Sequence, residues 1–378
     1  SIPIRLVQCV ISRITAMATC SSLTITKFSL LARSTHVLNR VKLTSAYRNF
    51  PSIGTVNHTQ TFQKRLISQT ARFLQSFKHI QAQSNNNKMS NYTVVEKGTP
   101  NSTNYSIYLK NASGNIVSPL HDIPLYANDT KTVLNMVVEI PRWTNAKMEI
   151  STATPLNPIK QDVKKGKLRF VANCFPHKGY IWNYGAFPQT WENPGHIEPS
   201  TGCKGDNDPI DVLEIGYRVA KRGEVIQVKV LGTVALIDEG ETDWKIITID
   251  VHDPLAEKMN DIGDVDKFFP GLLRATVEWF KIYKIPDGKP ENKFAFNGDA
   301  KCAAFANNII EETNKFWQGL ITKELDGGEI SLTNTANSGT PGFTKSDEAE
   351  QILAAAPEGG EPEELSDTVD RWHFVHLK

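Results

Sequence analysis

Alternating apolar and polar positions predict a series of short strands in the middle of the chain. They fall at residues 105–110, 136–140, 147–150, 168–171, 211–215, 225–237 and 244–251. An acidic turn over residues 238–243 joins the last two strands and predicts a hairpin with Gly240 at its bend. Many short, mostly antiparallel strands favour a closed barrel.

Helical spacing of apolar residues is found only in the later part of the chain. Pro270 suits a first helical turn, and the spacing from Leu272 to Tyr283 predicts a helix. A second helix is predicted over residues 300–323. The fold class is therefore predicted to be α+β, dominated by β. After residue 326, Gly, Pro, Ser and acidic residues predict a solvated tail whose apolar end, residues 372–377, docks on the domain.

Charge divides the chain into a basic and an acidic part. The 378 residues include 42 Lys and Arg and 41 Asp and Glu, but residues 1–90 hold twelve of the basic residues and none of the acidic ones. Residues 91–378 therefore hold 30 basic and 41 acidic residues. A basic, acid-free leader is typical of an organelle transit peptide. Translated non-coding message and a nucleic-acid-binding arm are the alternatives.

These patterns predict three segments: a basic leader over 1–90, a folded domain over 91–330, and an acidic tail over 331–378. The leader would give a mitochondrial form, whereas a start at Met89 would give a cytoplasmic one. No run of about 18 apolar residues predicts a membrane-spanning helix. The acidic domain opposes direct binding to nucleic acid. Five scattered cysteines fit neither a disulfide framework nor a zinc site and favour a reducing compartment; they are Cys9, Cys20, Cys174, Cys203 and Cys302.

Three carboxylates form the strongest chemical signal. Asp206, Asp208 and Asp211 lie within six residues on a segment that enters a predicted strand, and Pro209 stiffens it. Carboxylates this close repel one another, and a hard divalent cation such as magnesium relieves that cost. A calcium-binding EF-hand is excluded, because Asp211 and Tyr217 stand where its loop needs Gly and Glu. An Asx-rich turn without a metal remains the alternative.

Further acids and several cations accompany this cluster. Asp238 and Asp243 bracket the hairpin, although a solvated turn is the usual meaning of such a run. Lys147 and Glu149 are two residues apart and share one face of a strand. Arg169 lies in an apolar segment and needs an anionic partner. The remaining candidates are Glu139, Tyr180, Tyr184, Tyr283 and Lys284, and for each tyrosine core packing is the alternative.

This inventory favours metal-assisted phosphoryl transfer to water. Acids would hold metals, while Lys, Arg and Tyr would hold anionic oxygens. No Walker loop, dinucleotide fingerprint or nucleophile elbow occurs, so ATP, NAD and serine-based chemistry lack support.

Longer motifs carry a resemblance to a known family. The segment 206–212, Asp-Asn-Asp-Pro-Ile-Asp-Val, resembles the signature of family I soluble inorganic pyrophosphatases of eukaryotic, animal type. Supporting motifs lie at residues 138–149, 174–177, 184–191, 238–245 and 269–276. The resemblance spans about residues 115–325 and leaves the leader outside. It implies a five-stranded OB-like closed barrel with flanking helices.

The resemblance also implies a role for each site residue. Several magnesium ions per active site would be held by Asp206, Asp211, Asp243, Asp238 and Glu149, with Glu139 in the outer shell. The phosphoryl groups would be held by Lys147, Arg169, Tyr184, Lys245, Tyr283 and Lys284. Asp208 would orient or deprotonate the attacking water, and Tyr180 would line the same cavity and assist catalysis with Lys147 and Arg169.

The implied function is magnesium-dependent hydrolysis of inorganic pyrophosphate to two phosphates by metal-activated water. The expected state is a homodimer in the cytoplasm, without a membrane partner. The alternative from another class is an acidic OB-like interaction subunit of a chromatin-remodelling assembly, which would place the protein in the nucleus. An activity assay with and without magnesium separates the two.

Overall fold

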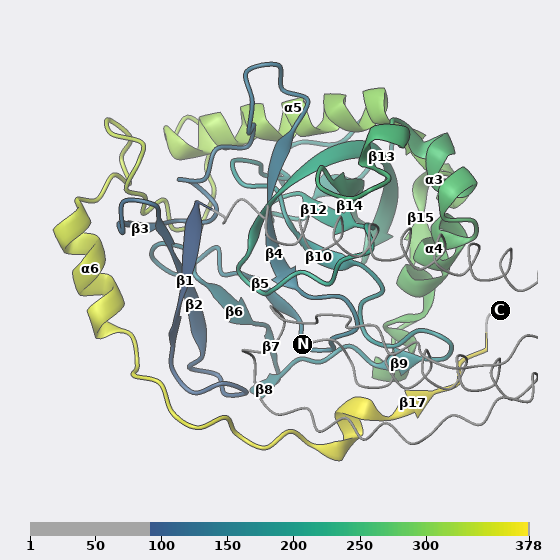
Figure 1. The fold of residues 1–378 in the computed structure, drawn as a ribbon, viewed down its shortest axis with the longest axis horizontal. Coiled ribbons are helices and arrows are strands. Elements are labelled where there is room, and N and C mark those ends of the chain that lie inside the picture. Colours follow the sequence, from purple (N-terminus) through teal and green to yellow (C-terminus); the bar gives the residue numbers. More distant parts are fainter. Residues whose placement is uncertain (1–90, 377–378) are drawn as a thin grey trace, which may run out of the picture. The chain divides into compact units, whose positions relative to one another are not determined.

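The computed structural model describes residues 91–376. The predictions for the leader lie outside the described residues. Five strands carry the main sheet (Figure 1): β4 (Leu134–Ile140), β10 (Asn183–Ala186), β12 (Asp211–Glu214), β13 (Val225–Asp238) and β14 (Glu241–Asp250). Each pairs with two of the others, in the order β14-β12-β10-β4-β13 and back to β14. Within this cycle of five strands, only the β12–β14 pairing is parallel.

The main strands are apolar on both faces because each face is covered. Val212 and Ile246 belong to a buried cluster that includes Ala306 and Ile310 of helix α5 (Ala303–Ile321). The next residue of each strand, Leu213 and Ile247, belongs to a second buried cluster on the other face. Side chains alternate between faces along a strand, so a strand buried on both sides reads as a continuous apolar run. Helix α5 crosses one side of the main sheet (Figure 1).

The remaining strands lie outside this cycle of five. A second sheet has the order β1 (Tyr92–Lys97), β2 (Ser106–Asn111), β6 (Ile159–Gln161) and β5 (Met148–Ile150), with β3 (Ile116–Val117) on β2. β7 (Val163–Lys164) pairs with β8 (Lys167–Leu168), and β9 (Asn173–Cys174) pairs with β17 (Trp372–His373). The main sheet also holds β11 (Lys204–Gly205), β15 (Lys293–Phe294) and β16 (Lys301–Cys302). The β-dominated α+β class is thus confirmed.

The predicted hairpin is present and closes with a two-residue turn. Asp238 pairs with Glu241, and the two residues between them, Glu239 and Gly240, have φ of 51° and 98°. Such a turn matches the twist of the strands that it joins. It holds Asp238 and Asp243 on adjacent strands near the same end of the sheet.

Two predicted elements differ from the structure. Helix α4 (Leu272–Ile282) begins after Gly271, the N-cap, whose φ is 89°, so Pro270 precedes the helix instead of lying in its first turn. Of the expected strand 168–171, only Leu168 lies in a ladder, as the last residue of β8 (Lys167–Leu168). The backbone of Arg169 instead bonds to Asp162 and Lys147 on two different segments. Helix α3 (Ile262–Phe268) was not predicted.

The C-terminal segment forms more structure than its composition predicted. Helix α6 (Ser346–Ala355) buries Ala349 and Leu353 in a cluster with residues of β2 and β3. The chain then runs back across the domain to β17, beside β9 (Figure 1). The part of the chain that the structure describes also has four 3-10 turns: η1 (Ala256–Lys258), η2 (Ile285–Asp287), η3 (Ala295–Gly298) and η4 (Asp367–Asp370). Within residues 91–376, no helix combines the length and apolar character that crossing a bilayer requires.

Candidate active site

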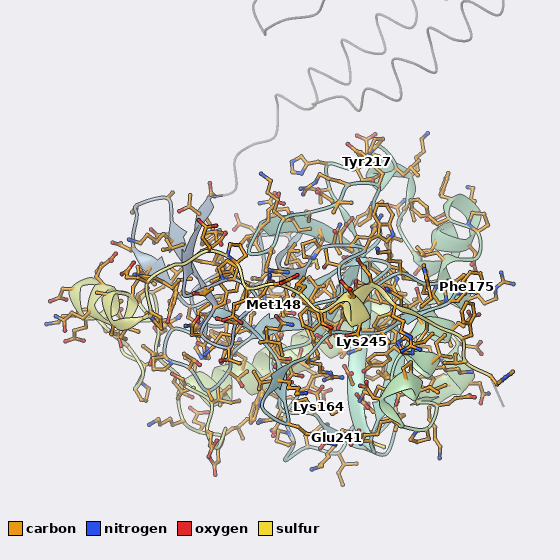
Figure 2. The ribbon with its side chains drawn as sticks, turned by 90° about the horizontal axis from the view of Figure 1, so that it is seen from below. Met148, Lys164, Phe175, Tyr217, Glu241 and Lys245 are labelled. Atoms are coloured by element: carbon orange, nitrogen blue, oxygen red, sulfur yellow. The ribbon has the colours of Figure 1, made fainter. Side chains whose placement is uncertain are left out.

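All fourteen predicted site residues line one cavity of about 140 Å³. They come from strands of both sheets, from the loops that follow β8, β9 and β11, and from the segment that follows α4. Figure 2 labels two of its lining residues, Met148 of β5 and Lys245 of β14. Pro209, Trp279 and Phe280 add apolar walls. The fold therefore brings together acids and cations that are up to 145 residues apart in the sequence.

A bend before β12 aims the clustered aspartates into this cavity. Asn207 has a φ of 74°, a left-handed conformation that Asn tolerates better than most residues. Its amide N–H donates to the Glu192 carbonyl at 2.9 Å, and its Oδ1 accepts from Trp191 Nε1 at 3.0 Å. The Asp208 N–H donates to Asp206 Oδ1 at 3.1 Å. These bonds fix the bend, so that Asp206 and Asp208 line the cavity on either side of it.

Lys245 is the buried centre of the site. Its side chain is 2% exposed, and its Nζ contacts carboxylate oxygens of both Asp211 and Asp243. The Tyr184 hydroxyl lies 3.2 Å from the same Nζ and donates to Asp211. Burial and the charge of Asp211 raise the pKa of Tyr184 well above its usual value. Tyr184 is therefore a protonated hydrogen-bond donor at neutral pH.

The other cations also pair with acids. Lys284 Nζ lies 2.5 and 2.6 Å from the two oxygens of Asp238. Lys147 contacts Glu149, so the two share one face as the sequence predicted. Each of these cations thus has an anionic partner in the cavity.

Asp162 is an acidic partner that the sequence analysis missed. Arg169 Nη1 lies 2.8 Å from Asp162 Oδ2, and Lys147 Nζ lies 3.7 Å from the same oxygen. Asp162 is the anionic partner that the apolar surroundings of Arg169 required. Because Asp162 lies just beyond the short strand β6, among polar residues, its sequence context gave no signal.

Negative charge exceeds positive charge in the cavity. Its lining has seven carboxyl groups and four Lys or Arg side chains, an excess of three acids. Burial, reinforced by neighbouring carboxylates, raises the pKa of Asp206 and Glu139 well above the usual range. Burial likewise raises the pKa of Asp208 and of Asp243 to about 7, in Asp243 against the opposing effect of Lys245. Such uncompensated charge favours the binding of divalent cations.

Glu192 belongs to this acidic cluster but was not predicted. One oxygen each from Glu192, Asp206 and Asp243 lie within 4.8 Å of one another. Glu192 Oε1 accepts the Trp244 N–H at 3.0 Å, whereas its buried Oε2 finds no hydrogen-bond partner among residues 91–376. An orphaned carboxylate oxygen beside two more acids fits a hard cation and its water ligands. The only sequence signal for Glu192 was its place directly after Trp191, the last residue of the family motif at 184–191.

Comparison with known proteins agrees with this donor set. The family model described as inorganic pyrophosphatase matches residues 136–318. A protein of Drosophila melanogaster named inorganic pyrophosphatase is 74% identical over 291 residues, 77% of this chain and 86% of its own. The chain belongs to the inorganic pyrophosphatase family. A bovine inorganic pyrophosphatase is 57% identical over 77% of this chain and 100% of its own. The predicted animal-type membership is thereby confirmed.

Solved structures of inorganic pyrophosphatases have the same fold. That of the Schistosoma japonicum inorganic pyrophosphatase matches with a TM-score of 0.72 and 50% sequence identity. The match covers 75% of this chain and all of the other. Enzymes of the inorganic pyrophosphatase family are metal-dependent, which agrees with the excess of carboxylates in the cavity.

Proposed function

We propose that this cavity binds pyrophosphate together with several magnesium ions and hydrolyses it by attack of a water molecule. As a member of its family, the chain is an inorganic diphosphatase, and it converts pyrophosphate to two phosphates. The observation that carries the proposal is the convergence of seven acids and four cations on one cavity of about 140 Å³. Hard, oxygen-rich donors of this kind suit magnesium.

The acids divide into metal ligands and a base. Asp206, Asp211 and Asp243 would hold one ion, and Asp238 and Glu149 would complete the others. Glu139 accepts the Ile150 N–H at 2.6 Å and would act from the outer shell. Bound magnesium supplies positive charge to phosphoryl oxygens and lowers the pKa of a water ligand. Asp208 lies between Asp206 and Asp211 in sequence and would take the proton of the attacking water.

The cations would hold the two phosphoryl groups. Lys147, Arg169, Lys245 and Lys284 each contact a carboxylate, which holds its head group in the cavity before substrate arrives. With their acidic partners engaged as metal ligands, these head groups would be free to turn to phosphate oxygens. Arg169 would bind two oxygens at once through its planar fork. The hydroxyls of Tyr180, Tyr184 and Tyr283 would add hydrogen bonds, because burial raises the pKa of each and keeps it protonated.

The test is release of phosphate from pyrophosphate by the purified chain with magnesium, with calcium and with excess chelator. We expect activity with magnesium only, because calcium is larger and tolerates irregular coordination that misplaces the water. Full activity in excess chelator would contradict the proposal. The chromatin-remodelling alternative has no support among these observations.

We further propose that the closed cycle of five strands is the OB-like barrel of the family. Its support is the pairing order, in which every strand of the cycle has two neighbours. The same three segments are proposed as before: a leader that directs a mitochondrial form, a catalytic domain, and a tail after residue 330. Cytoplasmic and nuclear forms stay predictions.

A homodimer is proposed from exposed aromatic residues near the end of the chain. Phe175 contacts Trp372 and Phe374, with ring centroids 5.9 and 5.5 Å apart. Phe374 is 77% and Phe175 is 57% exposed. Exposed clusters of large apolar side chains mark interfaces. Sedimentation analysis should give twice the monomer mass, and Phe374→Ser should shift the population toward monomer; a monomeric wild-type chain would refute this.

A further inference from the structure

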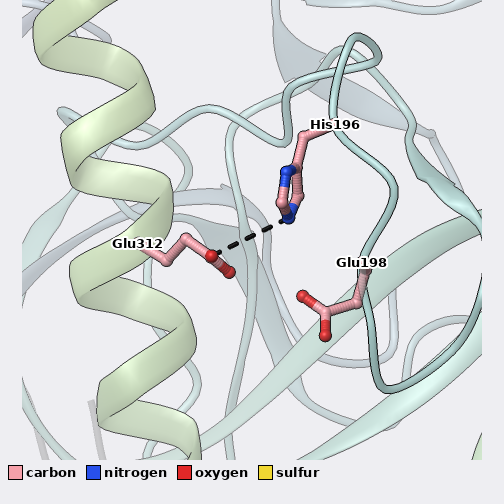
Figure 3. A group of neighbouring side chains, drawn as sticks. All are labelled: His196, Glu198 and Glu312. Atoms are coloured by element: carbon pink, nitrogen blue, oxygen red, sulfur yellow. Dashed lines mark ion pairs between the residues drawn. The ribbon is translucent and has the colours of Figure 1, made fainter.

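A second group of metal-ligating side chains lies outside the catalytic cavity. It consists of His196, Glu198 and Glu312 (Figure 3). His196 and Glu198 belong to the loop between β10 and β11, and Glu312 belongs to α5. One ligand atom from each lies within 4.8 Å of the other two. The three side chains point toward one common point from two separate elements (Figure 3).

The imidazole of His196 is held in place but lacks a hydrogen bond. Its ring packs on Phe316 of α5, with centroids 4.9 Å apart. Its Nε2 lies 3.8 Å from Glu312 Oε1, which is too long for a hydrogen bond. This nitrogen is buried and finds no hydrogen-bond partner among residues 91–376. An unpartnered buried nitrogen is costly, so it points to a missing ligand.

The two carboxylates are arranged to receive a cation. Glu198 is 9% exposed, and its Oε1 accepts hydrogen bonds from Ser200 N and Oγ at 2.9 and 2.6 Å. Such bonds orient a carboxylate in the way that outer partners orient metal ligands. One oxygen of Glu198 and one of Glu312 lie within 4.8 Å of each other. A cation between the two carboxylates would relieve the repulsion of negative charges this close.

We propose that His196, Glu198 and Glu312 bind a first-row transition-metal ion of the zinc class, with water as the remaining ligand. An imidazole nitrogen beside two carboxylates suits zinc and disfavours magnesium and calcium, which take oxygen ligands. The small cavity that these side chains line has about 20 Å³, room for one ion or one water. Ligands bound at about 2.1 Å lie at most about 4.2 Å apart. A small rotation of the half-exposed Glu312 side chain would bring the ligand atoms from within 4.8 Å of one another to within this distance.

This ion would fasten the loop that leads to the catalytic aspartates. Glu198 N donates to the Cys203 carbonyl at 2.9 Å, and β11 then runs directly into Asp206. Glu192 of the catalytic cluster lines the same small cavity. Binding would tie the loop to α5 beside the active site and would stabilise the folded chain. The inference does not depend on the proposed function, because none of the three ligands lines the catalytic cavity.

The experiment measures zinc bound to the full chain by equilibrium dialysis and metal analysis. The catalytic acids can also bind zinc, so the stoichiometry of variants is compared under identical conditions. We expect Glu312→Gln and His196→Gln each to bind one ion fewer than the wild type. The control His252→Gln changes a histidine that is 56% exposed and lies 3.0 Å from Asp250, and it should bind as many ions as the wild type.

Cobalt absorption and the unfolding midpoint test the same site independently of zinc stoichiometry. Cobalt should give visible absorption bands that are weaker in Glu312→Gln than in the control, and zinc should raise the unfolding midpoint of the control more than that of the variant. Glu312→Gln should retain wild-type magnesium-dependent activity without zinc, because Glu312 lies outside the catalytic cavity. Equal zinc stoichiometry in all four proteins, or identical cobalt spectra, would overturn the proposal and leave only a trapped water.

Discussion

Replacing Lys245 by Met tests whether this buried ammonium neutralises the catalytic acids. The Met side chain has a similar length and lacks the charge. Lys245 is 2% exposed and contacts both Asp211 and Asp243, which are 21% and 9% exposed. The substitution therefore leaves one fully buried and one partly buried carboxylate without their cation.

The loss of unfolding free energy in Lys245→Met depends on how deeply the two carboxylates are buried and on whether they are protonated. Removing one partner of a buried ion pair destabilises a protein by about 3–5 kcal/mol. Burial raises the pKa of Asp243 to about 7 even beside Lys245, well above its value in an unfolded chain. A carboxyl with a raised folded pKa destabilises the fold increasingly as pH rises through that pKa. We therefore expect a loss of about 3–4 kcal/mol at about pH 8 and a smaller loss at about pH 6.

The assay is urea unfolding, followed by tryptophan fluorescence, with chelator and with magnesium. Magnesium should stabilise Lys245→Met more than the wild type, because it supplies the charge that the variant lacks. The rate of pyrophosphate hydrolysis should also fall roughly 10- to 150-fold, the worth of one hydrogen bond to a charged group.

A matched control removes an ammonium from a more exposed ion pair. Lys110 Nζ lies 2.8 Å from Glu350 Oε1, and the side chains are 25% and 45% exposed. Lys110→Met should cost no more than about 1 kcal/mol at either pH. If Lys245→Met shows the same loss at both pH values and the same magnesium increment as the wild type, Lys245 does not neutralise the acids.

Three further substitutions test separate parts of the site and the core. Asp208→Asn should lower turnover by about 10²–10⁴ with an unchanged magnesium requirement, whereas Asp206→Asn should raise that requirement; magnesium titrations of phosphate release separate the two. Arg169→Lys should raise KM for pyrophosphate at an unchanged unfolding midpoint, and unaltered kinetics would make Arg169 only a structural partner of Asp162. Burial lowers the pKa of His121 to about 4, so the unfolded chain binds one more proton below about pH 6.5 and stability falls as pH falls. His121→Gln should remove about 1.4 kcal/mol per pH unit from that slope, measured by urea unfolding between about pH 5 and pH 6.

The long elements of the fold could be predicted from the sequence, because their patterns extend over many residues. The second predicted helix, residues 300–323, is close to the observed Ala303–Ile321. Helix α3 has only seven residues and one fully buried side chain, so its apolar pattern is weak. Its start was nevertheless encoded, since Asp261 and Asp264 form a capping box. Helix α6 was missed because the acidic composition around it outweighed the i, i+4 pair of buried residues.

Residue spacing alone predicted the candidate site only where its acids lie close together in the sequence. The spacing of Asp206, Asp208 and Asp211 predicted a cation site without knowledge of the fold, and the three side chains do line one cavity. Glu192 shows why spacing is insufficient. Its position is fixed by a hydrogen bond from the backbone of Trp244, 52 residues away, and its place beside Asp206 exists only after β14 pairs. A single acid between apolar and polar residues carries no local sign of such a role.

The Lys and Arg side chains of the cavity take part both in the stability of the fold and in the proposed binding of substrate. A buried Lys or Arg cannot remain unpaired in a folded chain, so each must find an acid before any ligand arrives. In this cavity those acids are also the ones that suit magnesium, apart from Asp162, which pairs with Arg169. The ion pairs of Lys245 with Asp211 and of Lys284 with Asp238 therefore hold in place both the cations proposed to bind phosphate and the acids proposed to bind metal. Binding would separate each pair without leaving either member uncompensated, so the stability of the fold and the affinity for substrate depend on the same charges.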